Sequence, residues 1–156
     1  MWLAVLPAFF ALGCSGSERA PTIERVEMRL SGWTALDVSV NKMGQGQYHS
    51  NRPRPGGNSG SFSIQPQQFA SILQRLEPFR RQAVPVTERS KAEFVEGKPC
   101  PEGTPFVTDA GGFYVRWVGP SYNQHYLADL GCDWERNVER NKALLAIVES
   151  LPVPQP

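Results

Sequence analysis

The sequence predicts an α+β domain, with an antiparallel sheet of five to seven strands and two helices packed on one face. Three observations lead to this fold class. Apolar and polar residues alternate along several short segments, two longer segments carry apolar residues at helical spacing, and 14 glycines and 14 prolines mark many turns. With 156 residues and 40% hydrophobic content, the chain is long enough for one core and too short for two. We therefore expect a single domain over residues 22–152, followed by a tail over 153–156.

The first strands are expected between residues 26 and 48. Apolar and polar residues alternate over 26–30 and again over 36–40, which is typical of half-buried strands, and the turn 31–33 joins them. The glycines of 44–46 then punctuate a further strand that continues through Tyr48. These segments predict an antiparallel meander at the start of the domain.

An exposed loop and a helix follow. The arginines, prolines and glycines of 52–60 rule out regular structure and predict a loop, after which 61–64 reads as a short strand. Pro66 suits the first turn of a helix over 66–82. The apolar stripe of this helix consists of Phe69, Ile72, Leu73, Leu76 and Phe79.

The second half repeats the order of strands and then a helix. Prolines and glycines among charged residues predict a long loop over 83–103. A hairpin is expected from 106–108 through a turn at 109–112 into 113–118, and a last strand over 122–130. For the second helix, Asp133 is the expected N-cap. Its buried stripe is expected at Trp134, Val138, Leu145 and Val148, ending at Leu151 and Pro152.

The N-terminus reads as an export signal. Residues 2–12 are almost wholly apolar, and no charged side chain precedes Glu18. Eleven residues are too few to span a bilayer, which takes about 20, so the segment 1–13 fits a signal peptide better. It ends in Ala11-Leu12-Gly13-Cys14, which resembles the lipobox of bacterial lipoproteins.

This resemblance implies that Cys14 becomes the first residue of the mature protein. It would carry a thioether-linked diacylglycerol and an amide-linked acyl chain, such as palmitate, and residues 14–21 would form a lipidated tether to the membrane. Ser15 after the cysteine resembles lipoproteins of the outer membrane rather than the inner one. We thus expect the domain to be anchored in the bacterial cell envelope and to face the periplasm. There are two alternatives. One is an ordinary cleaved signal peptide in which Cys14 is not lipidated, and the other is that the N-terminal segment forms a buried strand or helix.

Two cysteines remain if Cys14 is lipidated. An even number in an oxidising compartment favours a disulfide between Cys100 and Cys132. It would close a loop of about 33 residues and contribute roughly 3–4 kcal/mol on the chain-entropy model. Two free buried thiols and a catalytic thiol are the alternatives, and the absence of a CxxC motif argues against redox exchange or zinc binding.

The order of several short segments carries a second resemblance. Gly-Gln-Tyr at 46–48, Gly-Ser-Phe-Ser-Ile at 60–64, a Phe- and Leu-rich helix, Thr-Asp at 108–109 and Leu-Pro-Val at 151–153 follow one another. This order is similar to small bacterial envelope lipoproteins that are grouped only as domains of unknown function. The resemblance implies the fold and the location and carries over no catalytic residue.

Sequence motifs for chemistry are sparse. A formal net charge of +1 gives no support to nucleic-acid binding. Neither His49 nor His125 belongs to a metal-binding motif, so we expect no metal and no cofactor. His125 is expected to face solvent and His49 to lie at a loop edge. Asp109 reads as a turn residue, and Asp129 is the remaining candidate carboxylate beside Cys132.

The function favoured by these features is a non-catalytic binding domain. The candidate binding loop carries Arg52 and Arg54 next to Tyr48 and His49, which could meet anionic lipid headgroups, wall carboxylates or an acidic envelope protein; the loop 83–103 is a second candidate. The alternatives are an inhibitor or immunity protein of an envelope hydrolase, or a small hydrolase. The hydrolase would use His125 or His49 with Asp109 or Asp129.

Overall fold

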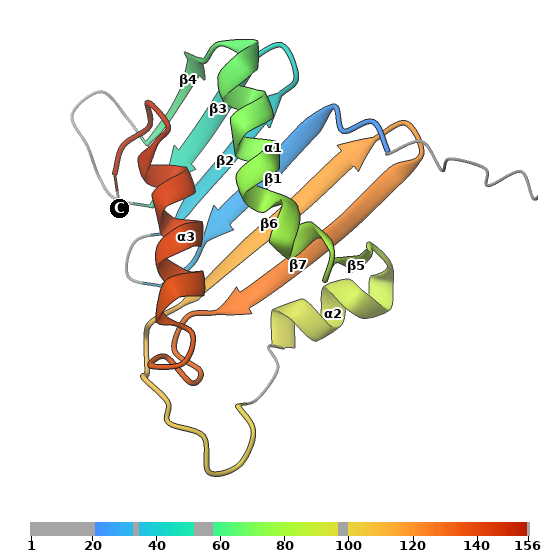
Figure 1. The fold of residues 1–156 in the computed structure, drawn as a ribbon. Coiled ribbons are helices and arrows are strands. Elements are labelled where there is room, and N and C mark those ends of the chain that lie inside the picture. The colour runs from blue at the N-terminus through green and yellow to red at the C-terminus, as the bar shows by residue number, and fades with distance from the viewer. Residues whose placement is uncertain (1–20, 33–34, 52–57, 97–99, 156) are drawn as a thin grey trace, which may run out of the picture.

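The computed structural model describes residues 21–32, 35–51, 58–96 and 100–155 and has the predicted α+β architecture (Figure 1). Seven strands form one sheet in the order β4-β3-β2-β1-β6-β7-β5, and every neighbouring pair is antiparallel. The strands are β1 Arg25–Leu30, β2 Leu36–Asn41, β3 Gln45–Ser50, β4 Ser59–Ser63, β5 Val84–Pro85, β6 Gly112–Gly119 and β7 Tyr122–Asp129. The helices are α1 Pro66–Arg80, α2 Glu88–Glu96 and α3 Val138–Glu149.

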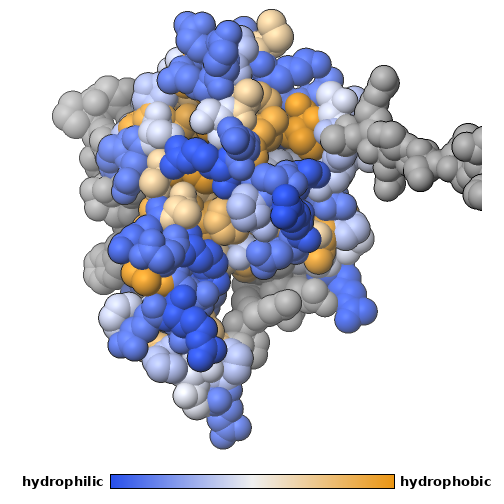
Figure 2. All heavy atoms as spheres, in the orientation of Figure 1, coloured by the Kyte–Doolittle hydropathy of each residue, from blue (hydrophilic) through white to orange (hydrophobic). Residues whose placement is uncertain are grey.

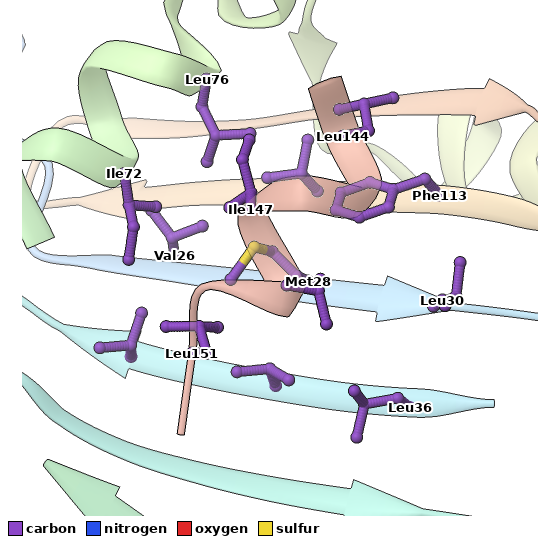
Figure 3. Packing of buried hydrophobic residues seen from close by; sticks show 14 of the residues in the cluster. Val26, Met28, Leu30, Leu36, Ile72, Leu76, Phe113, Leu144, Ile147 and Leu151 are labelled. Atoms are coloured by element: carbon purple, nitrogen blue, oxygen red, sulfur yellow. The ribbon is translucent and has the colours of Figure 1, made fainter. Parts of the chain in front are cut away.

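The hydrophobic core lies between the sheet and the two long helices. Figure 1 shows α1 and α3 lying across the same face of the sheet. Alternate strand residues point to that face because the side-chain period of a strand is two. Figure 3 shows Val26, Met28 and Leu30 of β1 in one row beneath residues of both helices. The buried helix residues are Phe69, Ile72, Leu76 and Phe79 of α1 and Leu144, Ile147 and Val148 of α3.

The outward side of the helices is polar. In Figure 2, hydrophilic residues form most of the visible surface over α1 and α3, and apolar residues show mainly between them. This division matches the narrow apolar stripe of α1. None of the helices in the described residues is long and apolar enough to cross a membrane.

Two glycines in β3 and β4 lie beneath aromatic rings. Gly46 faces Phe62 across the strands, and Gly60 faces Tyr48. A Cβ atom on Gly46 would lie 2.2 Å from the Phe62 ring, and one on Gly60 would lie 2.7 Å from the Tyr48 hydroxyl. Both rings contact the core on the helix side, so Tyr48 does not share a face with its neighbour His49.

The prediction of a long loop over 83–103 is wrong. Val84 and Pro85 form the edge strand β5, and α2 follows directly. Thr87 and Ser90 stabilise the start of this helix, because the Ser90 amide donates to Thr87 Oγ1 at 3.1 Å and the Thr87 amide donates to Ser90 Oγ at 2.9 Å. This reciprocal pair is a capping box with serine in place of the usual Glu or Gln. The loop expected over 52–60 is also shorter, because Ser59 and Gly60 belong to β4; residues 52–57 lie outside the described residues.

The expected hairpin of 106–108 with 113–118 does not form. Both edges of β6 are occupied, one by β1 and the other by β7, so no edge remains for a third partner. Phe106 instead forms an isolated bridge with Cys132, and the Val107 amide donates to the Gly131 carbonyl at 3.1 Å.

The last helix begins later than predicted. Asn137, not Asp133, is the N-cap of α3. Asp133 has φ +47°, a left-handed conformation that places it in the turn before the helix. Trp134 is consequently 44% exposed rather than buried. At the other end, Val153 was expected in the tail 153–156 but is 7% exposed and packs against the core.

Candidate functional site

The face of the sheet opposite α1 and α3, called the open face below, carries polar side chains in register. Antiparallel pairing aligns one residue from each strand into rows that cross the sheet. The first row is Ser59, His49, Asp37, Arg29, Tyr114 and Leu127. The second row is Ser61, Gln47, Ser39, Glu27, Arg116 and His125.

All residues of these rows except Arg116 line a hollow of about 1090 Å³ on the open face. Its walls come from six strands and from Lys91 of α2. Over β2 and β4 the lining includes small residues, among them Ser39, Ser59 and Ser61. Small side chains leave space above the strands, which is why the sheet is hollowed there rather than covered.

The charged side chains of the hollow pair with one another or with close neighbours. Arg29 donates to the Asp37 carboxylate, and this hydrogen bond together with the charge of Asp37 raises the pKa of Arg29. Glu27 lies 3.2 Å from Arg116 and 2.8 Å from Arg25. These pairs leave the open face polar, with little local excess of positive or negative charge.

His49 forms a hydrogen bond with Ser59 on the neighbouring strand. Nδ1 of His49 lies 2.8 Å from Ser59 Oγ, and Asp37 is the cross-strand partner of His49 on its other side. A serine next to a histidine is the minimum of a nucleophile and base pair. The Asp37 carboxylate, however, accepts from Arg29 with both oxygens, so it orients that guanidinium.

His125 is buried, which contradicts the prediction that it faces solvent. Its side chain is 0% exposed, with Nε2 lying 2.8 Å from Ser90 Oγ and Nδ1 3.3 Å from the Tyr114 hydroxyl. Ser90 Oγ donates to the Pro85 carbonyl at 2.9 Å and has only one proton. Ser90 Oγ therefore accepts a hydrogen bond from Nε2–H of His125, which fixes the tautomer of the imidazole. This hydrogen bond joins α2 to the sheet and does not activate Ser90 as a nucleophile.

Protonation of His125 opposes this packing. Burial lowers the pKa of His125 from its ordinary value of 6.5, and the positive charges of Arg116 and Lys91 lower it further. The folded protein thus binds fewer protons than the unfolded chain at pH values below about 6.5. Above that pH, His125 should contribute no pH dependence to the free energy of unfolding. As the pH drops toward the pKa of His125 in the folded protein, the free energy of unfolding should fall by at most about 1.4 kcal/mol per pH unit.

Urea unfolding between pH 7.5 and 5.5 tests this expectation. His125→Gln should flatten the dependence on pH, because the amide does not titrate. His49→Gln is the matched control, since His49 is exposed and is the other histidine of the chain. Equal slopes in the two variants would show that His125 does not cause the dependence.

The structure does not bring together the residues of the hydrolase hypothesis. His49 on β3 and His125 on β7 are separated by three strands, a distance of about 19 Å. Asp129 lies four residues along β7 from His125, about 13 Å away, and its Oδ1 accepts from the amides of Gly131 and Cys132. Asp109 lines a second hollow at that same end with Asp129 and has φ +62°, as a turn residue does. No group of three or more possible metal ligands occurs among the described residues.

Of the residues predicted for the binding loop, Tyr48 and His49 line the hollow, and the others lie outside the described residues. Tyr48 points its ring to the helix side, whereas His49 lies on the open face. Arg52, Arg54 and Cys14 fall outside the described residues. Ser39, Gln47 and Ser61 also line the hollow and were not predicted as site residues. Alternation along the strands marks them as polar positions, but only the strand order brings them together.

Cys100 and Cys132 form a disulfide in the structure, with an S–S distance of 2.00 Å and a Cα–Cα distance of 5.6 Å. It joins the segment after α2 to the end of β7. Phe106 is 57% exposed and Val107 is 43% exposed on the segment that leads from Cys100 toward β6. We call residues 101–107 the disulfide loop.

No protein-family model matches the chain, and no curated protein or solved structure is significantly similar to it.

Proposed function

We propose that this protein is a lipid-anchored binding protein of the bacterial cell envelope and that its ligand lies in the hollow of the open face. The main support for ligand binding is the difference between the two faces of the sheet. One face is covered by α1 and α3, and the other is hollowed and polar. A concave surface with convergent polar groups is the usual form of a binding site.

The chemistry of the hollow favours binding over catalysis. Asp37 and Glu27 are engaged with arginines, and the proton of Ser90 is donated to a carbonyl, not poised for transfer to His125. These groups are arranged to present hydrogen bonds at fixed positions.

The anchoring half rests on the N-terminal sequence. The apolar segment 2–12 and Cys14 support export and acylation, and Ser15 favours the outer membrane. The chain enters the sheet beside the end of β6, where the Glu24 amide donates to the Val118 carbonyl at 2.8 Å. Residues 14–21 would connect this point to the membrane.

Intact mass of the protein extracted from host membranes tests the anchor. We expect a species that begins at Cys14, carries added acyl mass and gains two hydrogens on reduction of the remaining cysteine pair. An unprocessed chain with three free thiols would overturn the anchor.

Photo-crosslinking in cells tests the proposal that the open face binds a ligand. A benzophenone side chain placed at Gln47, on the open face, should form an adduct with an envelope component in cells. Gln67 is the matched control, because it is also an exposed glutamine but lies on α1. Adducts at position 67 and none at position 47 would overturn the open face as the binding surface.

A second candidate function, inhibition of an envelope hydrolase, is favoured by one observation. The disulfide loop is tied at one end by Cys100–Cys132 and at the other by the Phe106–Cys132 bridge, and it presents the exposed side chains of Phe106 and Val107. A loop that is rigid before binding loses less conformational entropy when it enters a cleft. An adduct to a hydrolase from position 106, with none from position 47, would favour this candidate over the first.

A further inference from the structure

We propose that the hollow on the open face binds an uncharged oligosaccharide chain. This inference rests on the proposed function and names the class of ligand for the same site. It follows from the pairing of the charges, the kind of hydrogen-bonding groups and the position of one aromatic ring.

The charged residues that line the hollow are all engaged in ion pairs. Arg29 pairs with Asp37, and Glu27 pairs with two arginines. Lys91 of α2 lies 2.7 Å from Glu88. A charged ligand gains less from groups whose charge is already paired, whereas a neutral ligand can hydrogen-bond to them as they stand.

The groups between these pairs suit hydroxyl-rich molecules. Ser39 and Ser61 can each donate and accept, and the Gln47 amide offers both functions as well. Serine side chains lose little conformational entropy when they are fixed. A sugar chain presents alternating donors and acceptors of the same kind along its length.

Tyr114 supplies an apolar surface at one side of the hollow. The ring is half-buried and packs edge-on against His125, with centroids 5.6 Å apart and an interplanar angle of 89°. Leu127 is its cross-strand partner. An aromatic ring held in this way offers an amphipathic surface to the apolar C–H face of a sugar. The volume of about 1090 Å³ exceeds that of most small-molecule sites, which favours a chain of several units.

Isothermal titration calorimetry on the detergent-extracted protein tests the inference with defined probes. The neutral probes are β-1,4-linked hexamers of N-acetylglucosamine and of glucose, and the charged probe is a hexamer of galacturonic acid. We expect at least one neutral hexamer to bind at least about tenfold more tightly than the acidic one.

Two substitutions locate the site. Ser39→Tyr fills the floor of the hollow and should weaken binding by at least about tenfold. Ser63→Tyr is the matched control, because Ser63 lies on the same face of β4 but does not line the hollow, and it should change affinity less than about twofold. Gln47→Ala, at an exposed position, serves as a second variant if Ser39→Tyr unfolds the protein.

The outcomes separate this inference from the proposed function. The uncharged peptide acetyl-(Ser-Gly)4-amide serves as a further probe. If this peptide binds, Ser39→Tyr abolishes its binding and neither neutral sugar binds, the oligosaccharide inference is wrong while the open face remains a binding site. Tighter binding of the acidic hexamer, or equal weakening by Ser39→Tyr and Ser63→Tyr, would also overturn it. The crosslinks from Gln47 test the open face without reference to sugars.

Discussion

Replacing Leu76 by alanine should lower the free energy of unfolding by about 3–4 kcal/mol. Leu76 is 0% exposed and lies on the stripe of α1 that faces the sheet and α3. Figure 3 shows it directed into the core beside Ile147. The substitution removes buried methyl groups and leaves a cavity that two helices and a sheet cannot easily close. Because a domain of this size has a total stability of about 5–15 kcal/mol, this loss is a large fraction of it.

Urea denaturation followed by circular dichroism measures this effect. Met43→Ala is the matched control, because it removes a similar apolar volume at a position that is 66% exposed. The control should change the free energy of unfolding by less than about 0.5 kcal/mol. If both variants lost the same stability, the arrangement of α1 on the sheet would be wrong.

Replacing both Cys100 and Cys132 by serine should lower the free energy of unfolding by about 3–4 kcal/mol. The disulfide joins residues 32 positions apart, so it removes much of the freedom of this segment in the unfolded chain. In the folded state β6 and β7 are held in the sheet, but the described contacts of the disulfide loop with the rest of the domain are few, mainly the Phe106–Cys132 bridge and the backbone hydrogen bonds Val107–Gly131 and Asp133–Pro105. Loss of the disulfide should therefore also loosen the disulfide loop.

Chemical denaturation with and without reductant measures the contribution of the disulfide. Reduced wild-type protein should match the double variant, and reductant should have no effect on the double variant, which serves as the control. Hydrogen exchange should increase over 101–107 before it increases in β6. A double variant as stable as the oxidised protein would contradict the entropic account.

Local patterns were sufficient to predict the elements whose side chains meet the core. The alternation of Val26, Met28 and Leu30 predicts β1 because each of these residues must be buried on one face. The apolar stripe predicts α1 in the same way, because five apolar residues at helical spacing must be buried against another part of the fold. The fold class followed from the order of such segments.

The errors fall where short-range polar interactions or long-range pairing decide the structure. The helix α2 is only nine residues long and mostly polar, and Thr87 and Ser90 stabilise its start; the prolines and charges around it obscured this signal. The local sequence predicts a hairpin of 106–108 with 113–118, but β1 and β7 occupy the two edges of β6. Asp133 suited an N-cap by residue type, and its place in a turn depends on the chain path after Cys132.

By itself, the sequence determined the α+β class, the bounds of most strands and the first helix, because these depend on the period of apolar residues along a segment. Only the tertiary structure decided which polar residues form a site. Ser61, Gln47, Ser39 and Glu27 come from four strands and lie in one row because of strand order and register. His125 is buried because α2, distant in sequence, covers it. Such proximity depends on how the segments pair and pack, and no local pattern in the chain encodes that pairing.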